Sequence, residues 1–186
     1  MAFYRQACRR LWFTGAVLAA LGNSLANKPA MSVGPSEVFV LGGHSDGPVR
    51  LGSSPKRFDI SDDVLKTILQ RLRERDDRRL YVVIDDIRRG EPLGIFYHVF
   101  FAAAGHGVEP LQDNDHVGSF NLFERYQRFV SFDVTDQFQR LVARPSAKLA
   151  VTIQPALGGT ASERESLAKA LDDAPVIIGG VRLALQ

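Results

Sequence analysis

Two consecutive segments, 78–87 (RRLYVVIDDI) and 93–105 (LGIFYHVFFAAAG), have apolar residues with the two-residue period of β-strands. Both are rich in β-branched and aromatic residues, and RRGEP (88–92) between them is typical of a turn. In the second segment both alternating faces carry apolar residues. We therefore expect it to lie inside a β-sandwich, with Phe100 in the core.

Other segments extend this pattern. Strands are predicted at 38–43, 116–123, 128–134, 148–155 and 174–185, and short helices at 135–143 and 162–173. Segment 61–75 has a helical stripe of apolar residues, with Ser61 as a plausible N-cap. Together these elements predict a mainly β fold, an antiparallel, jelly-roll-like β-sandwich with one longer amphipathic helix and short helical inserts.

The first 26 residues differ from the rest of the chain. Arginines precede the apolar run LWFTGAVLAAL (11–21), and Ser24-Leu25-Ala26 fits a signal-peptidase site. The run is shorter than the roughly 20 apolar residues that span a bilayer. We therefore expect a signal peptide at 1–26, a linker at 27–44 leading into a first strand, and the β-sandwich domain at 45–186.

Export to the periplasm or the medium follows if this signal is real, and a cytoplasmic location follows otherwise. The alternatives at the N-terminus are an ordinary helix or a wrongly assigned start codon. The formal net charge is only +2, from 23 basic and 21 acidic residues, which indicates neither a nucleic-acid partner nor, after signal removal, a membrane surface. A single cysteine, Cys8, excludes a disulfide framework.

Ser119, His116 and Asp133 are the residue types of a serine hydrolase. A nucleophilic serine is normally exposed on a sharp turn beside an oxyanion hole, whereas Ser119 lies within a predicted strand. His116 and Ser119 are three positions apart, so on a regular strand their side chains point to opposite faces. The sequence therefore predicts no catalytic residues.

A metal site is not indicated either. The four histidines, His44, His98, His106 and His116, lie in separate segments and form neither HxH nor HxxxH. Three of them could converge in space, but no helical pair preorganises them. DNDH (113–116) lacks the glycine and glutamate of a calcium loop, and no glycine-rich loop precedes a helix. We expect His98 to be a strand residue with a hydrogen-bonded ring, and we expect no cofactor or metal bound by this chain.

Six segments, taken in order, resemble the C-terminal β-sandwich domain of tyrosinases and plant polyphenol oxidases. They are SDGPVRLGSSPKRFDIS (45–61), FYHVFF (96–101), HVGSFNLF (116–123), VSFDVTDQFQRL (130–141), LAVTIQPAL (149–157) and VIIGGVRLAL (176–185). His98 stands where the family usually has aspartate. The resemblance covers roughly 36–186 and implies that 116–123 is a framework strand, in which Gly118 allows close packing.

In that family this domain follows the dicopper catalytic domain and covers its copper pocket with a residue carried on a loop. The dicopper site needs more imidazoles than the four histidines present here. The resemblance therefore implies a non-catalytic accessory or shielding subunit of a separate tyrosinase catalytic subunit, which would hold the copper. The subunit would cover the active site or aid folding or copper loading in trans.

The turn at 124–125 places Phe123 and Tyr126 as candidates for the residue that plugs the partner's pocket. Their alternative role is to cap the sandwich. The sequence is also consistent with two other functions, an exported β-sandwich binding module with an unrelated ligand and a truncated fragment of a full-length tyrosinase.

Overall fold

The computed structural model describes residues 37–43, 47–75, 77–89, 94–103, 113–121, 125–143 and 148–186. The predicted signal peptide at 1–26 lies outside the described residues, as do His44, His106 and Phe123.

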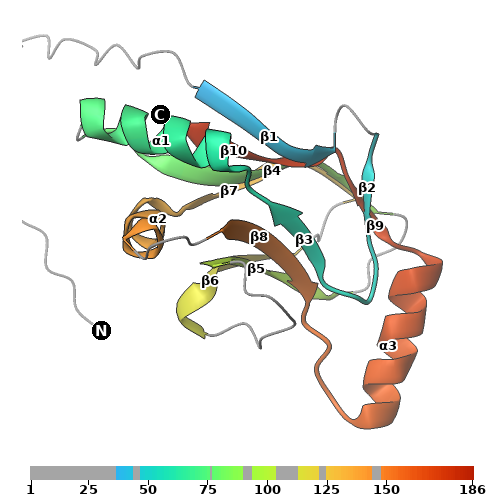
Figure 1. The fold of residues 1–186 in the computed structure, drawn as a ribbon. Helices are drawn as coiled ribbons and strands as arrows, with labels where there is room; N and C mark the ends of the chain where they lie inside the picture. The colour runs from blue at the N-terminus through green and yellow to red at the C-terminus, as the bar shows by residue number, and fades with distance from the viewer. Residues whose placement is uncertain are drawn as a thin grey trace, which may run out of the picture. The chain divides into compact units, whose positions relative to one another are not determined.

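Two antiparallel sheets form the fold (Figure 1). The first, sheet A, has the strand order β1 (Glu37–Gly43), β10 (Gly180–Leu185), β4 (Leu80–Arg88), β9 (Val176–Ile178) and β2 (Val49–Leu51), with β7 (Tyr126–Asp133) also paired to β4. The second, sheet B, has the order β3 (Lys56–Asp59), β8 (Leu149–Pro155), β5 (Phe96–Ala103) and β6 (His116–Asn121). The prediction of a mainly β, antiparallel sandwich is confirmed.

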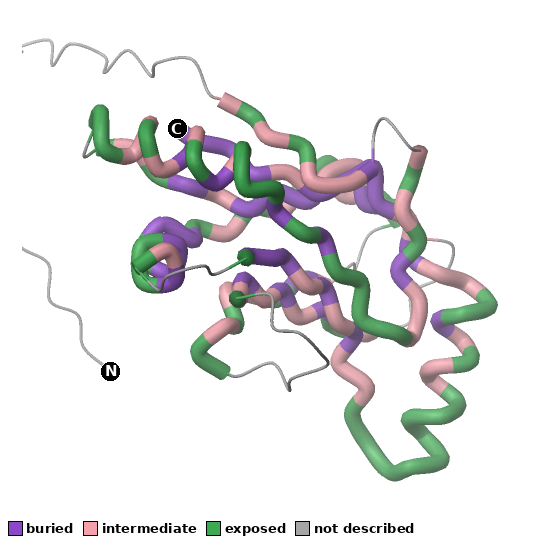
Figure 2. The backbone as a smooth tube through the Cα atoms, in the orientation of Figure 1, coloured by how far each residue is buried: buried purple, intermediate pink, exposed green. Residues whose placement is uncertain are grey.

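The core lies between the two sheets (Figure 2). Its fully buried side chains come from both layers, among them Ile84 and Leu183 of sheet A and Phe101 and Ile153 of sheet B. At Gly118 the layers approach so closely that a Cβ atom would lie 2.3 Å from a ring carbon of Phe132. The close packing expected at this glycine is therefore confirmed.

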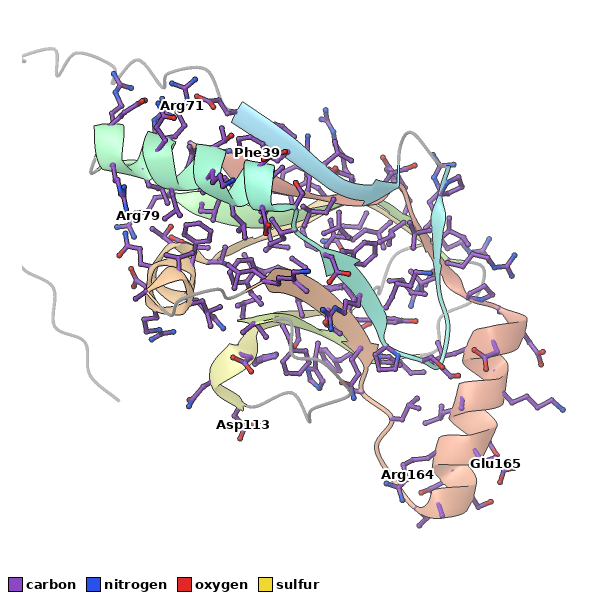
Figure 3. The ribbon with its side chains drawn as sticks, in the orientation of Figure 1. Phe39, Arg71, Arg79, Asp113, Arg164 and Glu165 are labelled. Carbon is purple, nitrogen blue, oxygen red and sulfur yellow. The ribbon has the colours of Figure 1, made fainter. Side chains whose placement is uncertain are left out.

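Three helices, with a short 3₁₀ turn at Asp113–Asp115, complete the described residues. In α1 (Asp62–Glu74), Ser61 accepts a hydrogen bond from the Val64 amide, as expected of an N-cap, and Leu65 and Ile68 are buried. Arg71 of this helix forms a 3.2 Å ion pair with Glu37 of β1 (Figure 3 labels Arg71).

Helix α3 (Ala161–Asp173) begins at a capping box formed by Thr160 and Glu163. Its 13 residues match the helix predicted at 162–173. Arg164 and Glu165 of this helix are exposed (Figure 3). Near its end, Asp172 accepts 2.8 Å hydrogen bonds from the backbone amide and the hydroxyl of Ser53, which ties α3 to the turn after β2.

The segment FDVTD (132–136) turns the chain from β7 into α2 (Thr135–Val142). Asp133 accepts hydrogen bonds from the amide and the hydroxyl of Thr135, at 2.9 and 2.6 Å. The Thr135 hydroxyl in turn accepts a 2.8 Å hydrogen bond from the Leu80 amide. The helix then buries Phe138 against the ring of Phe101, so this corner closes one end of the core.

Three sequence predictions need correction. The strand predicted at 38–43 is present as β1, but it pairs along β10 and its inward side chains Phe39 and Leu41 pack against the core, so the sandwich begins within the range 27–44 that was assigned to a linker. The single strand predicted at 174–185 is two strands separated at Gly179, whose amide donates to the Asp85 carbonyl.

The third correction concerns β5. Its odd-numbered side chains, Tyr97, Val99 and Phe101, face the core, whereas Phe100 lies on the outer face of sheet B and is only half-buried. The prediction that Phe100 lies in the core is therefore wrong, because only one of the two apolar faces of β5 packs against the opposite sheet.

Candidate functional site

One end of the sandwich gathers the ends of four strands. β4 ends and β7 begins at the pair Arg88 and Tyr126, while β5 begins and β6 ends at the pair Phe96 and Asn121. The Arg89 amide donates to the Arg125 carbonyl at 3.0 Å, which closes the ladder next to Tyr126. This end contains the turn on which the plug residues were predicted.

Tyr126, the first residue of β7, is 50% exposed. The guanidinium carbon of Arg88 lies 6.0 Å from the centre of its ring, within the range of a cation–π interaction. Arg88 is itself oriented by Asp86, with hydrogen-bond and ion-pair contacts of 2.8 Å, and this hydrogen bond raises the pKa of the guanidinium. The phenol ring is therefore presented at the surface on a paired strand, with a cation on one side.

Not every tyrosine of this end is accessible. Tyr97 is buried, stacks on Phe120 with ring centres 5.3 Å apart, and donates its hydroxyl to the Leu51 carbonyl at 3.5 Å. Burial raises the pKa of its phenol to about 12. Tyr97 therefore belongs to the core.

A second group of polar side chains lies on the outer face of sheet B. The Ser119 hydroxyl is 2.7 Å from Nδ1 of His98 and 2.9 Å from Nε2 of His116. The two imidazole centres are 5.2 Å apart, and the ring of Phe100 lies edge-on to both. The expectation that His98 is a strand residue with a hydrogen-bonded ring is confirmed.

This arrangement corrects the prediction that His116 and Ser119 point to opposite faces. In the ladder between β5 and β6, Val99 faces Gly118 but Phe100 faces His116, so Val117 is an additional residue in β6. Such a β-bulge interrupts the alternation of side chains, and it brings His116 to the face that carries Ser119. A glycine within a strand, Gly118, is a sequence signal from which a bulge could have been predicted here.

Asp133 does not join this group. It lies on sheet A, where its carboxylate accepts a hydrogen bond from the Thr135 hydroxyl and lies 3.8 Å from the guanidinium of Arg79. Of the three residue types of a serine hydrolase noted in the sequence, the structure therefore brings together Ser119 and His116 but not Asp133.

Among the described residues, no three His, Cys, Asp or Glu side chains are grouped in a way that could hold a metal ion. No helix in that part of the chain is long and apolar enough to cross a membrane.

Comparison with known proteins gives the following similarities. The structure is similar to part of latent apple tyrosinase, with a TM-score of 0.46 and 16% identity over 76% of this chain and 28% of that chain. It is also similar to part of latent aurone synthase, a polyphenol oxidase, from its natural source, with a TM-score of 0.45 and 15% identity over 74% of this chain and 24% of that chain. The chain thus spans about a quarter of the length of these solved proteins. No family model and no curated protein matches the sequence.

Proposed function

We propose that this chain is a non-catalytic accessory subunit that shields the active site of a separate tyrosinase-type dicopper oxidase. The observation that carries the proposal is where the six family-like segments lie in the fold. In chain order they supply β2 and β3, then β5, β6, β7 with α2, β8, and finally β9 with β10. Segments that resemble one domain therefore contribute to a single two-sheet core.

The half-exposed ring of Tyr126 supports a shielding role. A tyrosinase pocket accepts a phenol, and Tyr126 presents a phenol at a strand end that is held by its pairing with Arg88. An aromatic ring also stacks favourably against the imidazoles that surround a copper pair. We therefore assign the role of pocket plug to the turn between β6 and β7, with Tyr126 or Phe123 as the residue that enters.

An exported module for an unrelated ligand such as a carbohydrate is less well supported. Such modules commonly present several aromatic rings on one surface. Among the large exposed aromatic side chains described here, only Phe96 and Tyr126 lie at the same end of the sandwich, on different sheets, and Phe129 lies three residues further along β7.

The proposal is tested by adding this chain to the tyrosinase catalytic chain of the same organism and measuring diphenol oxidation. Wild type is expected to inhibit, and Tyr126→Ala or Phe123→Ala is expected to relieve the inhibition. Phe129→Ala is the matched control, because Phe129 is equally exposed, at 51%, but lies three residues further along β7.

Equal inhibition by all variants would remove both residues from the plug role. No inhibition by wild type would contradict shielding. In that case, a higher copper content of the partner after co-expression would instead support a role in folding or copper loading.

A further inference from the structure

The cluster of His98, Ser119 and His116 has no part in the proposed shielding, and it lies on the outer face of sheet B. One hydroxyl oxygen lies within hydrogen-bond distance of two ring nitrogens, at 2.7 and 2.9 Å. A serine hydroxyl has a single proton, so it donates to one imidazole and accepts from the N–H of the other. Both ring nitrogens are therefore directed at the same small volume.

The backbone holds this arrangement in place. His98 and Ser119 are directly opposite each other in the β5–β6 ladder. The bulge at Val117 and Gly118 turns the side chain of His116 to the same face of the sheet. β5 is paired on both sides, with β6 and with β8, so its side chains start from fixed positions. The ring of Phe100 lies 5.4 Å from that of His116 and 6.3 Å from that of His98, and it borders the cluster on one side.

We propose that this cluster binds one divalent transition-metal ion of the class that prefers imidazole, namely Zn²⁺, Ni²⁺ or Cu²⁺. The ligands are Nδ1 of His98 and Nε2 of His116, and the Ser119 hydroxyl and water complete the coordination. Metal–nitrogen bonds of about 2.0–2.1 Å place neighbouring ligand atoms about 3 Å apart. The oxygen–nitrogen distances of 2.7 and 2.9 Å are close to that spacing, so the hydroxyl already lies beside each imidazole nitrogen as a neighbouring ligand would.

The type of ion follows from the donor atoms. Two neutral imidazoles suit zinc, copper and nickel, whereas calcium and magnesium require carboxylate and carbonyl oxygens. His116 and Ser119 are exposed, which leaves room for the water ligands that a site with few protein donors needs. The inference departs from the expectation that this chain binds no metal, because histidine spacing does not reveal the strand register that brings the two rings together.

The experiment is calorimetric titration of the metal-free full chain with ZnCl₂, NiCl₂ and CuCl₂, with no other ligand present. Wild type is expected to bind one equivalent of at least one ion. His98→Gln and His116→Gln are each expected to weaken that binding more than about tenfold, because removing even a supporting group of a metal site commonly costs that much. The matched controls are His44→Gln and His106→Gln, which alter the two other histidines of the chain.

A structural readout accompanies the titration. The ring resonances of His98 and His116 are expected to shift together when Zn²⁺ is added, or to broaden together when paramagnetic Ni²⁺ or Cu²⁺ is added, in a heteronuclear NMR spectrum. Ser119→Ala keeps both imidazoles and is expected to reduce affinity less than either histidine substitution. The proposal is overturned if wild type binds none of the three ions, or if the controls lose as much affinity as the cluster variants. It is equally overturned if the two ring resonances do not respond to a bound ion.

Discussion

At Gly118 the backbone of β6 lies against the ring of Phe132 in the opposite sheet, and no side chain fits between them. Gly118→Ala is therefore expected to lower the free energy of unfolding by about 1–3 kcal/mol, because overpacking a core forces neighbouring groups to move. Chemical denaturation measures this effect. Gly158→Ala is the control, since a Cβ at Gly158 would have no atom within 4 Å, and it should leave stability nearly unchanged. Equal stability of both variants would contradict the close approach of the sheets.

Asp172 provides a residue-scale prediction about pH. Hydrogen bonds from the Ser53 backbone amide, and then from its hydroxyl, hold the pKa of this carboxyl below its ordinary value of 3.8. A carboxyl whose pKa is lower in the folded state stabilises the fold above its ordinary pKa, and this contribution is lost as the pH falls through the folded value. Asp172→Asn should therefore be less stable than wild type near neutral pH.

The same two proteins should become more similar in stability as the pH falls well below 3.8. Denaturation of both over this pH range tests the prediction. A stability difference that stayed constant with pH would show that the ionised carboxylate does not anchor α3 to the turn after β2.

At the scale of elements, β5 has a buried and an outward face that its sequence does not distinguish. Phe101 is fully buried, so Phe101→Asp places an unpaired carboxylate in the core, at a cost of several kcal/mol that is comparable to the stability of a domain. We expect this variant not to fold. Phe100→Asp, one residue earlier on the outer face, should fold with a smaller loss of stability. Near-ultraviolet circular dichroism and thermal melting compare the two, and the reverse order would contradict the assignment of the faces.

The elements themselves were predictable because their periods and caps are local signals. Helix α1 follows its apolar stripe from the cap at Ser61, and α3 and most strands lie within a few residues of the predicted ranges. The register between strands was not predictable. The bulge that places His116 beside Ser119 arises from the pairing of β6 with β5. The position of β1 depends on its pairing with β10, which lies at the other end of the chain.

In the candidate site too, local features were predictable from the sequence and contacts between strands were not. The sequence indicated that Tyr126 flanks a turn, and the structure places it half-exposed at the start of β7. It did not indicate Arg88 as the neighbour of that ring, because this contact depends on the β4–β7 ladder.

At the scale of the whole molecule, four histidines are too few for a dicopper centre, and the one cluster found among the described residues joins two of them. We therefore expect that the purified chain does not oxidise diphenols, even after incubation with copper salts. Spectrophotometric detection of quinone formation checks this expectation, with an active tyrosinase as the positive control. Copper-dependent quinone formation by this chain alone would contradict the accessory role.

Export of the chain would change its N-terminus. If residues 1–26 are a signal peptide, the chain recovered from the periplasm or medium should begin at Asn27. Intact-protein mass spectrometry measures this directly, and a full-length chain recovered from the cytoplasm would contradict it.

The central claim is that this chain covers the copper pocket of a partner oxidase. Its most direct test is calorimetric titration of the chain into the tyrosinase catalytic chain, with and without a phenol-like competitive inhibitor in the pocket. We predict that the two chains bind and that the inhibitor weakens their binding at least about tenfold, which corresponds to 1.4 kcal/mol. Absence of binding, or an affinity that the occupied pocket leaves unchanged, would contradict the claim.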